Sequence, residues 1–164
     1  IDGCNEVYDY IRWPGNWQKV YKNLLRVAEE SAKLDVITLS ISTTIQNINA
    51  LNIPKLVEIC QTIHNKAVPF FFIPVVGKPT LDITPKNILQ EAIDILEEMP
   101  HRDQIPVQDL LANYKKAVES SPKKQDVESF FKEQQMFDNK RKQNLFETVP
   151  YFIELAKEFD IERW

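Results

Sequence analysis

The order of hydrophobic and polar positions changes period several times along the first half of the chain. Apolar residues recur at helical spacing over residues 16–33 and again over residues 54–66. Asn16 is the expected N-cap of the first of these helices. Residues 36–45 and 68–76 are instead rich in β-branched and aromatic side chains, which is typical of strands. A crossover that contains a helix favours parallel pairing of the two strands that it joins. The pattern therefore predicts an α/β fold with a small, mainly parallel sheet.

The first predicted strand has two different faces. One face is aliphatic, and the other carries the hydroxyl groups of Thr38, Ser40, Ser42 and Thr44. A strand covered by helices on its apolar face, with small polar groups on the other, suits a barrel lumen that holds a polar ligand. The same alternation also fits an ordinary amphipathic edge strand facing water, so this pattern leaves both interpretations open.

The second half of the chain is predicted to be helical throughout. Four helices are expected, over residues 84–99, 106–120, 124–137 and 145–159. The first should have Thr84 as its N-cap and Pro85 as its first helical residue. Pro150 falls inside the last predicted helix and should start a new segment or kink it, because proline has no amide hydrogen to donate.

Composition argues against several classes of protein. The net charge of −4 is unfavourable for a nucleic-acid-binding face, since phosphate contacts require basic surface. No apolar run approaches the roughly 20 residues that a membrane-spanning helix needs. Cys4 and Cys60 lie far apart and form no metal-binding motif, so we expect two reduced thiols in a cytoplasmic protein. Neither nucleic acid nor a membrane is expected as a partner.

Three short segments, in order along the chain, carry a resemblance to a known family. The first contains Ile1-Asp2-Gly3, Tyr10-Ile11-Arg12 and Pro14-Gly15-Asn16-Trp17. The second contains Ser42-Thr43-Thr44-Ile45, Asn49 and Ile53-Pro54. The third contains Phe72-Ile73-Pro74-Val75-Val76, Pro79, Leu81 and Ile83. They resemble the regions around the fourth, fifth and sixth barrel strands of radical S-adenosylmethionine (radical SAM) enzymes, in the branch with SPASM or twitch extensions.

The resemblance implies a fold: a partial (half) parallel βα barrel over residues 1–83, with a helical C-terminal extension over residues 84–164. It also implies a chemistry. In this family three cysteines in a CxxxCxxC motif hold a 4Fe-4S cluster. The cluster cleaves S-adenosylmethionine reductively to start radical chemistry. This chain lacks that motif, so we expect a fragment that is inactive alone, binds neither group by itself, and requires the missing N-terminal half of the barrel.

Six residues match positions that lie near the cofactor in the family: Asp2, Ser42, Asn49, Pro74, Val75 and Val76. The resemblance implies that the first lies near the ribose, the next two near the cofactor at the fifth strand and its loop, and the backbone of the last three near the adenine. Each side chain also has a simple structural alternative. Asp2 can form a turn before Gly3. Asn49 can cap the helix entered at Pro54 or bond its own loop.

Other functions stay open at this level. A non-catalytic α/β interaction module is the main alternative, and a CxxxCxxC motif upstream of Ile1 would decide for the enzyme. A small hydrolase has little support, because the chain has no Gly-x-Ser-x-Gly or HExxH motif.

A half barrel would leave residues 36–44 as an open strand edge, which is a template for association. We therefore expect a homodimer through that sheet edge.

Overall fold

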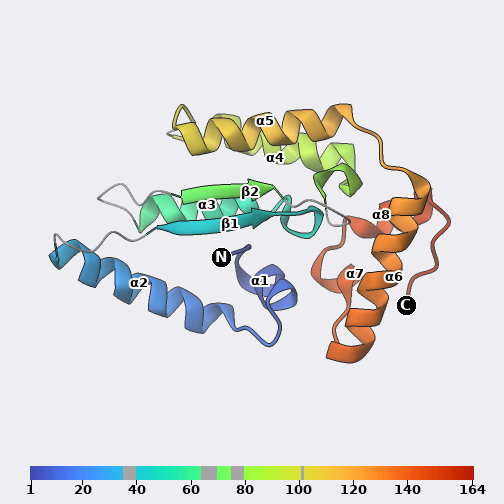
Figure 1. The fold of residues 1–164 in the computed structure, drawn as a ribbon, viewed down its shortest axis with the longest axis horizontal. Coiled ribbons are helices and arrows are strands. Elements are labelled where there is room, and N and C mark those ends of the chain that lie inside the picture. The colour runs from blue at the N-terminus through green and yellow to red at the C-terminus, as the bar shows by residue number, and fades with distance from the viewer. Residues whose placement is uncertain (35–39, 64–69, 75–79, 101) are drawn as a thin grey trace.

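The computed structural model describes residues 1–34, 40–63, 70–74, 80–100 and 102–164. Most of the described chain is helical (Figure 1). The elements, in order, are α1 (Asn5–Ile11), α2 (Trp17–Lys33), β1 (Ile41–Ile45), the 3-10 turn η1 (Asn47–Asn49), α3 (Ile53–Thr62), β2 (Phe70–Pro74), the 3-10 turn η2 (Leu81–Ile83), α4 (Lys86–Glu98), α5 (Ile105–Glu119), α6 (Lys124–Arg141), α7 (Leu145–Thr148) and α8 (Phe152–Glu158).

β1 and β2 form a two-stranded parallel sheet. Their register runs from Ile41 opposite Phe70 to Ile45 opposite Pro74, and α3 lies between them in the chain. Parallel pairing of the two predicted strand segments is therefore confirmed for these residues. The remaining parts of the two segments, residues 36–39, 68–69 and 75–76, lie outside the described residues.

The half barrel that the family resemblance implied is wrong. Only two strands of five residues each pair within the described ranges, and helices make up most of the rest. A barrel requires enough tilted strands to curve a sheet around a lumen. Two short strands cannot do this. The core is formed mainly by the packing of helices.

The buried apolar residues form two clusters. The larger joins Cys4, residues of α2 and α3, and β1 to the facing sides of α4 and α5. The smaller lies among α6, α7 and α8, and it also contains Tyr10, Ile48 and Ile83 from the first half of the chain. In Figure 1, α4 and α5 lie side by side next to β2, and α6–α8 gather at the other end of the molecule.

Local signals account for several helix boundaries. Asn16 caps α2 as its sequence suggests, because its side-chain oxygen accepts a hydrogen bond from the amide of Lys19 at 3.0 Å. Pro150 separates α7 from α8, which confirms the expected break. Pro85 is the N-cap of α4 and not its first helical residue, since its ψ of 137° is extended.

Within the described ranges, no helix is both long and apolar enough to cross a bilayer.

Candidate functional site

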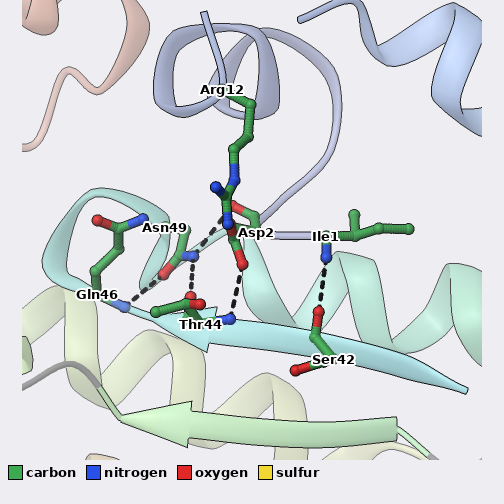
Figure 2. Close-up of polar contacts among 7 residues, drawn as sticks. All are labelled: Ile1, Asp2, Arg12, Ser42, Thr44, Gln46 and Asn49. Atoms are coloured by element: carbon green, nitrogen blue, oxygen red, sulfur yellow. Dashed lines mark hydrogen bonds and ion pairs between the residues drawn. The ribbon is translucent and has the colours of Figure 1, made fainter.

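The first residues of the chain lie against the edge of β1 that faces away from β2. The amino group of Ile1 donates a hydrogen bond to the carbonyl of Ser42 at 2.6 Å. The amide of Thr44 donates to Oδ1 of Asp2 at 2.8 Å. Figure 2 shows both contacts along one side of the strand. Two residues more than 40 positions away in sequence thus line this edge from Ser42 to Thr44.

Asn49 completes the contacts from the turn that follows the strand. Its side-chain Nδ2 donates to the carbonyl of Asp2 at 3.1 Å and to the carbonyl of Thr44 at 2.8 Å. Its Oδ1 accepts from the amide of Gln46 at 2.9 Å, which closes the turn η1 on itself. Asn49 is fully buried. Its amide therefore joins the chain start, the strand end and the turn (Figure 2).

A buried carboxylate lies at the centre of this cluster. The Asp2 side chain is only 2% exposed, and its Oδ2 pairs with the guanidinium of Arg12, which is 53% exposed. A buried anion is costly unless a cation or hydrogen-bond donors compensate it. Arg12 at the end of α1 and the amide of Thr44 provide that compensation.

Gly3 allows the chain to turn from this cluster into α1. Its φ is +133°, a conformation that side-chain-bearing residues rarely adopt. A Cβ at this position would lie 2.8 Å from Oδ1 of Asn52, and that oxygen accepts a hydrogen bond from the amide of Cys4 at 2.6 Å. Glycine is thus required both by the backbone conformation and by the close approach of Asn52.

The structure brings two of the six sequence-predicted site residues into contact. Asp2 and Asn49 meet beside Thr44 at the carboxyl end of β1. Ser42 lies on the same strand edge but nearer its amino end, where its carbonyl accepts from the amino group of Ile1. Pro74 ends β2 opposite Ile45, while Val75 and Val76 lie outside the described residues.

Of the structural alternatives weighed for these residues, one is observed. Asn49 bonds its own loop and does not cap α3. Asp2 does not accept from its near neighbours, because its hydrogen-bonding partner is the distant amide of Thr44.

Sequence reasoning missed Arg12 and Gln46 as members of the cluster. Arg12 stood inside the Tyr10-Ile11-Arg12 motif, so the resemblance contained a signal for it. Gln46 contributes through its backbone amide and through a reciprocal side-chain bond with η1, which residue type alone does not reveal. Backbone contacts of this kind depend on the local path of the chain and not on a motif.

Two tyrosines from the second half of the chain hold the turn that carries Asn49. The Tyr114 hydroxyl of α5 donates to the carbonyl of Ala50 at 2.6 Å. The Tyr151 hydroxyl donates to the carbonyls of Asn47 and Ile48. Burial raises the pKa of both phenols above their ordinary value, so they remain protonated donors.

The cysteines are poorly suited to bind a metal. Cys4 and Cys60 are free and buried, and burial raises the pKa of the Cys60 thiol to about 12. Metal ligation requires the thiolate form, which burial disfavours. The described residues also contain no group of three or more histidine, cysteine or acidic side chains placed to hold an ion.

The buried members of the cluster already have partners within the chain, which bears on whether they could contact S-adenosylmethionine. Both carboxylate oxygens of Asp2 have partners within the chain, and both amide hydrogens of Asn49 are donated to carbonyls. The Asn49 amide therefore has no hydrogen left for a further contact, and the Asp2 carboxylate is only 2% exposed beneath Arg12. Ser42 differs, since it lies on the exposed face of β1.

Comparison of the chain with protein-family models, with curated proteins and with solved structures found no match in any of the three. The geometry of the chain itself is therefore the basis for a functional proposal.

Proposed function

We propose that this chain is the C-terminal part of a cytoplasmic radical SAM enzyme. In that enzyme a 4Fe-4S cluster, bound by a CxxxCxxC motif in an N-terminal part, supplies the reductive cleavage of S-adenosylmethionine. This chain supplies neither cluster ligands nor, through Asp2 or Asn49, direct cofactor contacts. Its role is to complete the substrate side of the enzyme, and it is inactive alone.

One observation carries the proposal: separate motif segments converge at one end of a parallel strand pair. The first segment contributes Asp2 and the second contributes Asn49, which meet beside Thr44 at the carboxyl end of β1. Ser42, also from the second segment, lies nearer the amino end of the same strand. The third segment ends β2 at Pro74, directly beside Ile45. In open parallel α/β sheets, ligands bind beyond the carboxyl ends of the strands. The convergence supports a ligand site there.

The sequence upstream of Ile1 in the gene provides the first test. We expect the reading frame to continue into a CxxxCxxC motif. The corresponding longer protein, reconstituted anaerobically with iron and sulfide, should show the electron paramagnetic resonance signal of a reduced 4Fe-4S cluster and release 5′-deoxyadenosine from S-adenosylmethionine. A reading frame without the three cysteines, or a reconstituted protein that releases no 5′-deoxyadenosine, contradicts the proposal.

The isolated chain provides a second test. Titration calorimetry of residues 1–164 with S-adenosylmethionine should detect weak binding or none, because the open iron that anchors the cofactor in this family requires ligands that the chain lacks. Tight binding, or a stable iron–sulfur chromophore reconstituted on Cys4 and Cys60 alone, would show that the chain is not a dependent fragment.

A non-catalytic interaction module is the second candidate. It is favoured by the outward face of the sheet, where Ile73 is 52% exposed in the same face as Ser42 and Thr44. None of Ser42, Thr44 and Ile73 is charged, so these side chains present no like-charge repulsion to a second copy of the chain. Self-association through this face, in a protein whose gene encodes no cluster motif, would favour this candidate over the enzyme.

A further inference from the structure

Three backbone groups on the outer edge of β1 have hydrogen-bond partners from the chain start and from the turn after the strand. In a parallel strand, alternate residues direct their backbone groups to opposite neighbours. On the side away from β2, Ser42 and Thr44 direct their backbone groups outward, and three of these groups are the carbonyl of Ser42, the amide of Thr44 and the carbonyl of Thr44. The amino group of Ile1 donates to the Ser42 carbonyl, and the Asp2 carboxylate accepts from the Thr44 amide. The side-chain amide of Asn49 donates to the Thr44 carbonyl.

Asp2 takes a place that a backbone carbonyl holds in a regular ladder. The bond from Ile1 to Ser42 is that of a parallel strand added to the edge. If the ladder continued, the next acceptor for the Thr44 amide would be a main-chain carbonyl of the added strand. The carboxylate of Asp2 accepts that bond instead, and Gly3 then turns the chain into α1. The side chain thus ends the strand pairing without leaving a buried amide unpaired.

We propose that Asp2 and Asn49 are positioning residues that close the edge of β1, and that neither contacts the cofactor. Their charge, burial and bonding agree with this role. Arg12 neutralises the carboxylate from the solvent side, and the Asn49 amide is fully buried with three bonds inside the chain. This inference concerns the same site as the proposed function. The identity of the cofactor rests on that function, whereas the closure of the edge does not.

Amide hydrogen exchange in residues 1–164 tests the closure directly. Asp2→Ala should speed exchange of the Thr44 amide by about tenfold or more, since the acceptor is lost. Asp2→Asn retains an acceptor oxygen and should restore protection. Asn49→Ala should have the corresponding effect on the Gln46 amide. The buried amide of Leu111 in α5 reports whether a variant has lost global stability instead.

Ser42→Ala is the matched control, because its side chain is exposed and only its backbone joins the network. It should leave exchange at Thr44 and Gln46 unchanged. If Asp2→Ala leaves the Thr44 amide as protected as in the wild type, or if Asp2→Asn exchanges as fast as Asp2→Ala, the carboxylate does not close the edge and the inference fails.

Cofactor affinity in the longer, cluster-containing protein separates positioning from contact. Asp2→Asn should bind S-adenosylmethionine within about threefold of the wild type, because a direct charged contact would cost more than tenfold on removal. A loss greater than tenfold with the Thr44 amide still protected would overturn the inference. A wild-type longer protein that binds no S-adenosylmethionine contradicts the proposed function, and the exchange rates then decide the inference alone.

Discussion

At the scale of single residues, Asp138 shows how one buried carboxylate joins distant parts of the chain. Its Oδ2 accepts hydrogen bonds from the amide of Leu145 at 2.7 Å and from Nε1 of Trp164 at 2.8 Å. Tyr10 lies beside it, and burial together with the Asp138 charge raises the pKa of that phenol. The carboxylate therefore links α6, α7, the C-terminal residues and α1.

Asp138→Ala should lower the free energy of unfolding by about 1–3 kcal/mol, because it leaves the buried amide of Leu145 and the partly buried indole of Trp164 without an acceptor. Urea denaturation followed by circular dichroism measures the change. Asp103→Ala is the matched control, since that side chain is 93% exposed and should change stability by less than about 0.5 kcal/mol. Equal effects of the two substitutions would contradict the structural role of Asp138.

Cys60 should make the fold sensitive to alkali. Its pKa is about 12 in the folded chain, against an ordinary value of 9.0. Below pH 9 the thiol is protonated in both states. Above pH 9 the unfolded chain loses this proton first, so the contribution to stability falls as the pH rises towards 12.

The test compares the urea midpoints of the wild type and Cys60→Ala at pH 8 and pH 10. The wild type should lose more stability over this interval than the variant, by up to about tenfold in the folding equilibrium constant per pH unit. The comparison stops at pH 10 because Tyr10, Tyr114 and Tyr151 also have raised pKa values and add to the loss at higher pH. An identical pH dependence would show that Cys60 ionises alike in both states.

At the scale of elements, the turn η1 depends on helices far along the chain. Tyr114 lies in α5 and Tyr151 immediately precedes α8, yet both donate to carbonyls between Asn47 and Ala50. This 3-10 turn then places Asn49 against the edge of β1. The second half of the chain therefore determines the shape of a site whose side chains come from the first half.

Tyr114→Phe and Tyr151→Phe should each lower the free energy of unfolding by about 1–3 kcal/mol, because each leaves a buried carbonyl without its donor. They should also speed amide exchange at Gln46 and Asn49. Tyr21→Phe is the control, since the Tyr21 ring stacks on Trp17 and the substitution retains that ring. Unchanged exchange in the turn would show that the two hydroxyls do not hold it.

Element boundaries were predictable where a local signal marks them. Asn16 before α2 and Pro150 between α7 and α8 act through their own backbone and side chain, and both were predicted correctly. The start of α4 was missed by one residue, because Pro85 is compatible with both the N-cap and the first helical position. Parallel pairing of β1 with β2 followed from the helix between them.

At the scale of the whole molecule, both apolar clusters contain residues from each side of the boundary expected between residues 83 and 84. Buried residues of α4 and α5 belong to the same cluster as β1 and α3. Tyr10, Ile48 and Ile83 belong to the cluster formed by α6, α7 and α8. Truncation between residues 83 and 84 would therefore expose apolar surface of the described residues on both pieces.

The expected homodimer remains a prediction, and the structure changes where it should form. Residues 36–39 of the expected edge lie outside the described residues, and Ser42 and Thr44 are already bonded by Ile1, Asp2 and Asn49. Self-association should therefore use the face of the sheet that exposes Ile73.

Light scattering at several concentrations should detect a dimer that Ile73→Glu disrupts. Ile105→Glu is the matched control, because Ile105 is 76% exposed at the start of α5 and lies outside the sheet. The dimer of the Ile105→Glu variant should persist. A wild-type chain that is monomeric at every concentration, or a dimer equally sensitive to both substitutions, contradicts association through this face.

The sequence alone determined what depends on neighbouring residues. Helical periodicity, the cap at Asn16, the break at Pro150 and the two strand segments all arise from local backbone and side-chain preferences. The family resemblance also singled out Asp2, Ser42 and Asn49, whose assignment to one cofactor site stays a prediction.

Only the tertiary structure decided how many strands share the sheet and what the site residues do. Strand number depends on pairing across long sequence separations, which overturned the half barrel. Whether a carboxylate faces a ligand or a backbone amide depends on what lies opposite it. Asp2 meets Thr44 and Arg12, partners that the local sequence around Asp2 does not specify. Burial makes those bonds costly to lose, which is the physical reason that Asp2 and Asn49 hold the edge of β1 in place.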